Sequence, residues 1–144
     1  MVRVEAAEAG DLEALYALLA RVELPTEGLR EHLATALVAR DAGSIVGCVA
    51  LEVYGDAALL RSLAVTPSRQ GTGLGRRLAQ AALDLGRAAG VKTFCLLTLT
   101  AREFFAREFA FRPVARGETP SAVQQSVEFA SACPDTAQAM ILVR

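Results

Sequence analysis

The sequence predicts a single domain of the α/β (α+β) class, with one mixed central sheet and helices on both faces. Along the chain, apolar runs of strand character alternate with segments whose apolar residues recur at helical spacing. The length of 144 residues and the hydrophobic content of 53% suit one packed core. The chain contains no internal repeat, low-complexity tract or linker. We therefore expect residues 1–144 to form one domain.

The N-terminal half is expected to begin with a strand and a helix. Residues 2–6 alternate between apolar and polar side chains, which is typical of a strand. Asp11 is a favourable N-cap for a helix over residues 12–21, whose leucines share one face. A break at residues 24–29 is followed by a short helix to about His32. Three further strands are predicted before the middle of the chain: 35–41, 44–54 and 57–65, the last two forming a hairpin at Gly55-Asp56.

The C-terminal half is expected to hold three helices and three strands. Residues 74–89 have helical spacing, and Gly90 ends that helix. Residues 91–99 are apolar with little alternation, as in a strand that is buried on both faces. The other predicted elements are a helix over 100–109, a strand over 111–115, a helix over 119–130 and a strand over 138–143.

Composition and charge exclude several classes of protein. The net charge is −1 and the charges are interspersed, which argues against a nucleic-acid partner. No apolar run is long enough to cross a membrane and no signal segment is evident, so we expect a cytoplasmic location. The three cysteines, Cys48, Cys95 and Cys133, are far apart and His32 is the one histidine. We therefore expect no metal site and reduced thiols, with Cys48 and Cys95 buried in strands.

A glycine-rich turn carries the strongest functional signal. The apolar strand that ends at Val65 leads through this turn into an amphipathic helix. A helix N-terminus binds phosphate through its free N–H groups, and glycines let the phosphate approach the backbone. Arginine side chains nearby would add charge-assisted contacts. The glycines are Gly71, Gly73 and Gly75, and the arginines are Arg69, Arg76 and Arg77.

Three other interpretations compete for this turn. A dinucleotide-binding turn needs Gly-x-Gly-x-x-Gly, whereas the third glycine here comes one place early. A nucleotide-binding P-loop needs Gly-Lys-Ser/Thr, which is missing from this turn. A plain glycine-rich loop between a strand and a helix is the third alternative.

The full string Gln70-Gly71-Thr72-Gly73-Leu74-Gly75 fits the pattern Gln/Arg-x-x-Gly-x-Gly/Ala. This pattern resembles the acetyl-CoA signature of the GNAT superfamily of N-acetyltransferases, and the element order is similar over essentially the whole chain. The resemblance implies the GNAT fold, acetyl-CoA as cosubstrate and no metal. It also implies an acetyl carbonyl held at a splay between strands 57–65 and 91–99, polarised by a backbone N–H near Leu63. The implied cofactor-binding residues are Leu63, Ala64, Val65, Gln70, Gly71, Thr72, Gly73, Leu74, Gly75, Arg76 and Phe105.

Proton transfer requires a base, because only a neutral amine can attack the thioester. Glu52 and Tyr54 share one side of their strand and are the catalytic candidates. The alternative is that this side is simply wet. Phe105 stands where many GNAT enzymes carry a tyrosine acid, a departure that the good leaving group tolerates, and we expect Phe105 to pack in the core or on the cofactor. We interpret Cys95 as inert rather than as an acyl carrier, because no histidine lies near it in the sequence.

The acceptor side is predicted around Arg61. A charged residue in an apolar strand is costly unless it is paired or faces a cleft. Arg61 is therefore expected to bind a substrate carboxylate, or alternatively to form an ion pair with Glu52 on the next strand. The chain resembles one GNAT subgroup in three sets of residues: Arg61-Ser62-Leu63-Ala64-Val65; Leu97-Thr98-Leu99-Thr100-Ala101 followed by Phe104-Phe105; and Glu128-Phe129 with Cys133-Pro134. This subgroup holds amino-acid N-acetyltransferases and small arsenic-operon acetyltransferases thought to modify arsinothricin or phosphinothricin. The implied acceptor contacts are Glu27, Arg61, Ser62, Thr98 and Thr100, with ordinary strand-end hydrogen bonding as the alternative for the threonines.

The predicted function is acetyl transfer from acetyl-CoA to the primary amine of a small amino-acid-like acceptor, by direct attack in a ternary complex. Two alternatives stay open: a catalytically weak acyl-CoA-binding module and a protein or peptide N-terminal acetyltransferase. The apolar segment 137–143 is interpreted as able to pair or pack across a homodimer interface. Neither a nucleic acid nor a membrane is expected as a partner.

Overall fold

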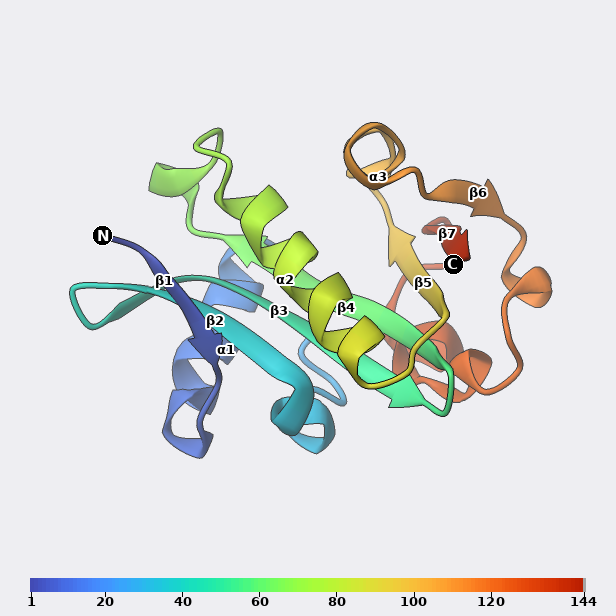
Figure 1. The fold of residues 1–144 in the computed structure, drawn as a ribbon, viewed down its shortest axis with the longest axis horizontal. Coiled ribbons are helices and arrows are strands. Elements are labelled where there is room, and N and C mark those ends of the chain that lie inside the picture. Colours follow the sequence, from blue (N-terminus) through green and yellow to red (C-terminus); the bar gives the residue numbers. More distant parts are fainter. Residues whose placement is uncertain (144) are drawn as a thin grey trace.

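The computed structural model describes residues 1–143 and contains one seven-stranded sheet (Figure 1). The strands are β1 (Arg3–Ala6), β2 (Ala36–Asp41), β3 (Ser44–Tyr54), β4 (Ala57–Val65), β5 (Thr93–Thr98), β6 (Arg112–Val114) and β7 (Gln138–Val143). Their order across the sheet is β1-β2-β3-β4-β5-β7-β6. The β4–β5 pair is parallel and the other pairs are antiparallel. The predicted mixed sheet is therefore confirmed.

The helices lie on both faces of this sheet. They are α1 (Leu12–Arg21), α2 (Leu74–Ala88) and α3 (Arg102–Phe109). Alternate residues of β3 separate the two faces, because Val49 and Leu51 belong to the α2 core whereas Cys48 and Ala50 belong to the α1 core. Figure 1 shows α2 in front of the sheet and α1 behind it. None of the helices within residues 1–143 is long and apolar enough to span a bilayer.

Helix α2 packs closely on the sheet because one of its residues lacks a side chain. A Cβ atom at Gly86 would lie 2.5 Å from the ring of Phe94 on β5 and 3.2 Å from Leu51 on β3. Leu78 and Leu83 of α2 are also buried in this core. This packing fixes the direction of α2, and with it the position of the glycine-rich turn that precedes the helix.

The predicted helix over residues 119–130 is wrong. The segment contains a 3₁₀ turn at Val123–Gln125 and a single π-helical turn at Glu128–Ala132. Between them Ser126 adopts an extended conformation, with φ −58° and ψ 141°, and its hydroxyl accepts the N–H of Glu128 at 3.2 Å. A serine that binds its own backbone in this way competes with helical hydrogen bonding. The chain consequently turns at Ser126, where the helical spacing predicted a continuous helix.

Two smaller expectations also need correction. Asp11 precedes α1 as predicted, but its carboxylate accepts hydrogen bonds from the N–H of Glu8 and from Arg40 instead of capping the helix. The short helix expected to end near His32 is a 3₁₀ segment, Arg30–Thr35, with a kink at His32.

The position of β7 bears on the expected homodimer. β7 pairs with β5 along its whole length and with β6 over Ala139–Ile141. These three residues therefore have no free edge for pairing with a second copy, whereas packing of the segment across a homodimer interface stays a prediction.

Candidate active site

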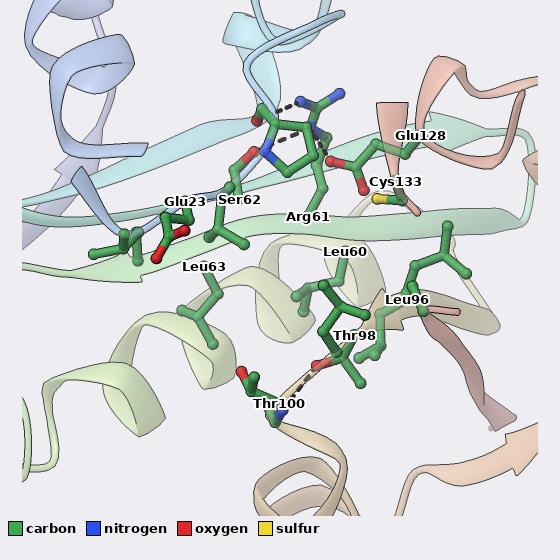
Figure 2. Close-up of a pocket in the computed structure, with 18 of the residues that line it drawn as sticks. Glu23, Leu60, Arg61, Ser62, Leu63, Leu96, Thr98, Thr100, Glu128 and Cys133 are labelled. Carbon is green, nitrogen blue, oxygen red and sulfur yellow. Dashed lines mark hydrogen bonds and ion pairs between the residues drawn. The ribbon is translucent and has the colours of Figure 1, made fainter. Parts of the chain in front are cut away.

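A cavity opens where β4 and β5 separate. The two parallel strands pair from Ala57 opposite Thr93 to Leu59 opposite Cys95 and then diverge. Beyond this point the cavity, of about 730 Å³, is lined by the continuing strands, as Figure 2 shows for Leu60 and Leu96. The splay that the family resemblance implied is thus present in the structure.

A bulge in β4 lies at the wall of this cavity. Ser62 and Leu63 together stand opposite the single residue Val49, because the register changes between the pairs Cys48–Ala64 and Ala50–Arg61. Ser62 has φ +60°, a left-handed conformation that costs about 1–2 kcal/mol for a residue other than glycine. A bulge leaves backbone polar groups without ladder partners. A backbone N–H near Leu63 can therefore lie outside the strand ladder, as the donor that the family resemblance implied must do.

The glycine-rich turn leaves the start of α2 open. Gly71 and Gly73 have φ +80° and +86°, and no atom lies within 4 Å of a Cβ built on either residue. Backbone conformation rather than crowding therefore favours glycine there. Gly73 precedes α2, and no side chain caps the first N–H groups of the helix. A second hollow of about 340 Å³ lies at this turn, lined by Gly71, Gly73, Gly75, Arg76, Phe104, Arg107 and Glu108.

The three arginines of the turn are not equivalent. Arg69 is paired with Asp41 at 2.6 Å, and Arg77 donates to the carbonyl of Val2 at 3.3 Å. Arg76 lines the hollow, where it pairs with Glu108 at 2.9 Å while its side chain remains 55% exposed. Of these three, Arg76 is the one placed for a ligand at the turn.

Arg61 is held in a buried cluster of charges. Its side chain is fully buried, with Nη1 2.8 Å from Glu52 Oε2 and Nε 3.3 Å from Glu128 Oε2. Nε also donates to Ser62 Oγ at 3.0 Å. The ion pair with Glu52 that was given as the alternative is present and is extended by a second carboxylate, whereas the substrate role of Arg61 stays a prediction. Nη2 retains donor capacity, since its hydrogen bond to the carbonyl of Pro25 is long, at 3.5 Å.

Glu52 and Tyr54 lie away from the lining of the cavity. Burial alone would raise the pKa of Glu52, but hydrogen bonds from Tyr54, Arg61 and Ser126 outweigh it and hold that pKa below its usual value. Burial, followed by the contact with Glu52, raises the pKa of Tyr54. His32 stands beside this pair, with Nε2 3.6 Å from Glu52 Oε1. The expectation that Glu52 faces the cleft is therefore wrong, because the carboxylate turns inward to Arg61.

Glu128 is the site residue that sequence reasoning missed. It lines the cavity although only 4% of the residue is exposed, and burial raises the pKa of its carboxyl against the opposing effect of Arg61. The pair Glu128-Phe129 carried part of the subgroup resemblance but indicated no role for Glu128, because the residue fell inside a predicted helix that does not form. Figure 2 shows its carboxylate beside Arg61 and Cys133.

Some of the other predicted site residues line the cavity and one of them does not. Thr98 and Thr100 line the cavity, and Thr98 Oγ1 accepts the N–H of Ala101 at 2.9 Å, as the strand-end alternative predicted. Phe105 is buried among aromatic rings and also lines the cavity. Glu27 is exposed and lies outside the lining, which its neighbours Glu23 and Pro25 reach instead.

The thiols are expected to react slowly. Burial raises the pKa of Cys95 to about 11, and burial together with Glu128 raises that of Cys133 to about 12. Burial also raises the pKa of Cys48 to about 12. Because the thiolate is the reactive form, alkylation of the folded protein at pH 8 should be far slower than that of an unfolded control. Rapid labelling of Cys95 would contradict its interpretation as an inert residue.

The profile of the acetyltransferase (GNAT) family matches residues 5–111. An amino-acid acetyltransferase of Neisseria meningitidis serogroup A is 28% identical over 128 residues, which cover 83% of this chain and 29% of that protein. The chain therefore spans less than a third of the length of this curated relative. Within residues 1–143, no group of three or more His, Cys, Asp or Glu side chains could hold a metal ion.

Solved structures share the fold. N-acetylglutamate synthase from Neisseria gonorrhoeae, complexed with coenzyme A and N-acetyl-glutamate, aligns with a TM-score of 0.84 at 24% identity. The alignment covers 99% of this chain and 35% of that one. A Mycobacterium tuberculosis protein in complex with CoA aligns with a TM-score of 0.79 at 23% identity over 99% of both chains. At these identities the likeness concerns the fold.

Proposed function

We propose that this chain, which belongs to the acetyltransferase (GNAT) family, is an acetyl-CoA-dependent N-acetyltransferase whose acceptor is the primary amine of a small amino-acid-like molecule. The amine, most simply an α-amine, attacks the thioester directly while both substrates are bound. The relatives that match in sequence are amino-acid acetyltransferases, which supports this class of acceptor.

The proposed binding of acetyl-CoA rests on the glycine-rich turn and on β4. The uncapped N–H groups of α2 and the side chain of Arg76 would hold the pyrophosphate. The backbone of residues 63–65 runs from this turn along the cavity wall, where it would pair with the pantetheine arm. The bulge at Ser62 and Leu63 would then donate a backbone N–H to the acetyl carbonyl.

The observation that carries the acceptor class is the Arg61–Glu128 pair. One guanidinium and one carboxylate lie 3.3 Å apart in the wall of the cavity, next to the bulge. An α-amino acid also carries opposite charges a few ångströms apart, so its carboxylate would accept from Arg61 while its ammonium donates to Glu128. Among residues 1–143, Arg61 is the only cationic side chain in the cavity lining. Hydroxyls of Ser62, Thr98 and Thr100 would complete the contacts.

The CoA thiolate needs little protonation in order to leave. Phe105 stands where many GNAT enzymes carry a tyrosine acid, and its ring packs against Phe104 and Phe111 at centroid distances of 5.1 and 5.5 Å. A CoA thiolate leaves without full protonation, so an apolar residue there is compatible with turnover. The demanding proton transfer is the one that makes the acceptor amine neutral.

The acceptor class is tested by CoA release from acetyl-CoA against a panel of amines. The panel should hold the common amino acids, phosphinothricin, arsinothricin, simple polyamines and short peptides. The proposal predicts turnover with an amino acid or an amino-acid analogue and none with polyamines. Preference for peptides would favour the N-terminal acetyltransferase alternative. If no amine of the panel causes CoA release while acetyl-CoA still raises the melting temperature, the result would favour the acyl-CoA-binding module.

A further inference from the structure

Glu128 is presented to the cavity by an unusual piece of backbone. The π-helical turn Glu128–Ala132 is closed by a hydrogen bond from the N–H of Cys133 to the carbonyl of Glu128 at 3.1 Å. Single π-helical turns are rare and occur frequently at functional sites. Here the turn brings a carboxylate on the C-terminal segment to the wall formed by β4.

The carboxylate lies close to the position where acetyl transfer is proposed. Glu128 Oε2 is 3.3 Å from Arg61 Nε, and the same Nε donates to Ser62 Oγ at the bulge, 3.0 Å away. Figure 2 shows Arg61, Ser62 and Glu128 gathered above Leu63 and Leu60. Glu128 is therefore separated from the bulge by a single side chain. Glu23, the other carboxylate of the lining, belongs to an exposed residue.

We propose that Glu128 is the catalytic residue that accepts the proton of the acceptor's ammonium group, an inference that rests on the proposed function. Glu128 carboxylate takes one proton from R–NH₃⁺, which leaves R–NH₂. The nitrogen lone pair then forms the C–N bond to the acetyl carbonyl carbon. As the C–S bond breaks, the electron pair leaves with the CoA thiolate, and the second ammonium proton passes to the thiolate or to water. The products are the acetamide and CoA, and Glu128 returns its proton to solvent.

Glu128 suits this role better than Glu52. Three hydrogen bonds hold the Glu52 carboxylate and keep its pKa low, so it is a weak base that does not line the cavity. The pKa of Glu128 is raised by burial, and also by the charges of Glu52 and Glu27, whereas Arg61 and Cys133 oppose that rise. A general base works best when its pKa approaches the operating pH.

The test compares Glu128→Gln with Glu52→Gln. Each variant removes one carboxylate from Arg61 while keeping its shape. Glu52 is held more closely than Glu128, at 2.8 Å against 3.3 Å, so loss of an ion pair alone should affect Glu52→Gln at least as strongly as Glu128→Gln. We expect Glu128→Gln to lower kcat about 10²-fold or more with little change in KM for acetyl-CoA. Its remaining activity should rise steadily with pH, because more acceptor is then neutral without a base. Wild type and Glu52→Gln should instead both show an acidic limb in kcat/KM. The limb of Glu52→Gln should lie at lower pH than that of wild type, because the charge of Glu52 helps to raise the pKa of Glu128.

Glu128→Asp keeps a carboxylate and should restore part of the rate together with the acidic limb. The proposal is overturned if Glu128→Gln retains the wild-type rate and limb, or if the limb disappears in Glu52→Gln instead. Should Glu128→Gln fail to fold, Glu128→Asp decides the matter, since the proposal requires this variant to turn over with the limb intact. A wild-type protein without turnover on any amine would overturn the proposed function and this inference together, whereas an active Glu128→Gln variant would overturn the inference alone.

Discussion

Arg61→Met should destabilise the protein by about 3–5 kcal/mol at neutral pH. The substitution fills a similar volume but removes the cation shared by Glu52 and Glu128, both of which are buried. Two uncompensated carboxylates then remain in the interior. The free energy of unfolding from urea titrations at pH 7 measures this loss directly.

The pH dependence identifies the cause of this loss. Without Arg61 the folded-state pKa of each carboxyl rises above its unfolded value, which is near 4.3 for Glu. The loss of unfolding free energy is therefore fully present above the folded-state pKa. It fades as pH falls towards the unfolded-state pKa. The difference between wild type and Arg61→Met should therefore narrow as pH falls from 7 towards 4.5. The triple variant Arg61→Met, Glu52→Gln and Glu128→Gln should regain most of the stability at pH 7, because it leaves no buried charge behind. Equal stability of wild type and Arg61→Met at pH 7 would contradict the buried cluster.

Gly73→Asp should weaken acetyl-CoA binding about 10–100-fold, or about 1.4–2.8 kcal/mol. Gly73 precedes α2 with φ +86°, and no atom lies within 4 Å of a Cβ added there. Aspartate and asparagine tolerate left-handed backbone better than other side chains, so the fold should accept either residue. Aspartate then sets a negative charge at the position proposed for the pyrophosphate, in a partly screened environment.

Gly73→Asn is the matched control, since it has the same shape and no charge. Isothermal titration of acetyl-CoA into both variants should show asparagine near wild type and aspartate strongly weakened, with the gap closing at high salt. Equal affinities for the two variants would mean that the pyrophosphate binds elsewhere and that the interpretation of residues 70–75 is wrong.

Local patterns predicted much of the fold because several elements have one strong signal each. Apolar spacing, together with Gly55 and Gly90, predicts the hairpin of β3 and β4 and the helix α2 close to their observed bounds. The turn that we propose to bind the cofactor is visible as a contiguous string. Such features depend on residues close in sequence, whose pattern is visible without tertiary contacts.

The acceptor side was predicted less well, because its side-chain contacts join segments that are distant in the sequence. Arg61 contacts carboxylates at positions 52 and 128. The neighbouring strand suggested Glu52 as an alternative partner, but nothing in the sequence indicated that Arg61 also meets Glu128. The helical spacing of residues 119–130 was genuine, yet Ser126 diverts the backbone and thereby places Glu128 at the cavity. Glu52 alternates like a cleft residue, but the sequence cannot show that the cation beside it turns it inward.

The fate of a labelled acetyl group tests the central claim most directly. Acetyl-CoA labelled in its acetyl carbon is incubated with the purified protein and the best amine of the panel, and the products are separated by mass. We predict one labelled acetamide on the acceptor amine for every CoA released. Release of CoA with the label in free acetate, or no release while acetyl-CoA still binds, would contradict the assignment of this chain as an amine acetyltransferase.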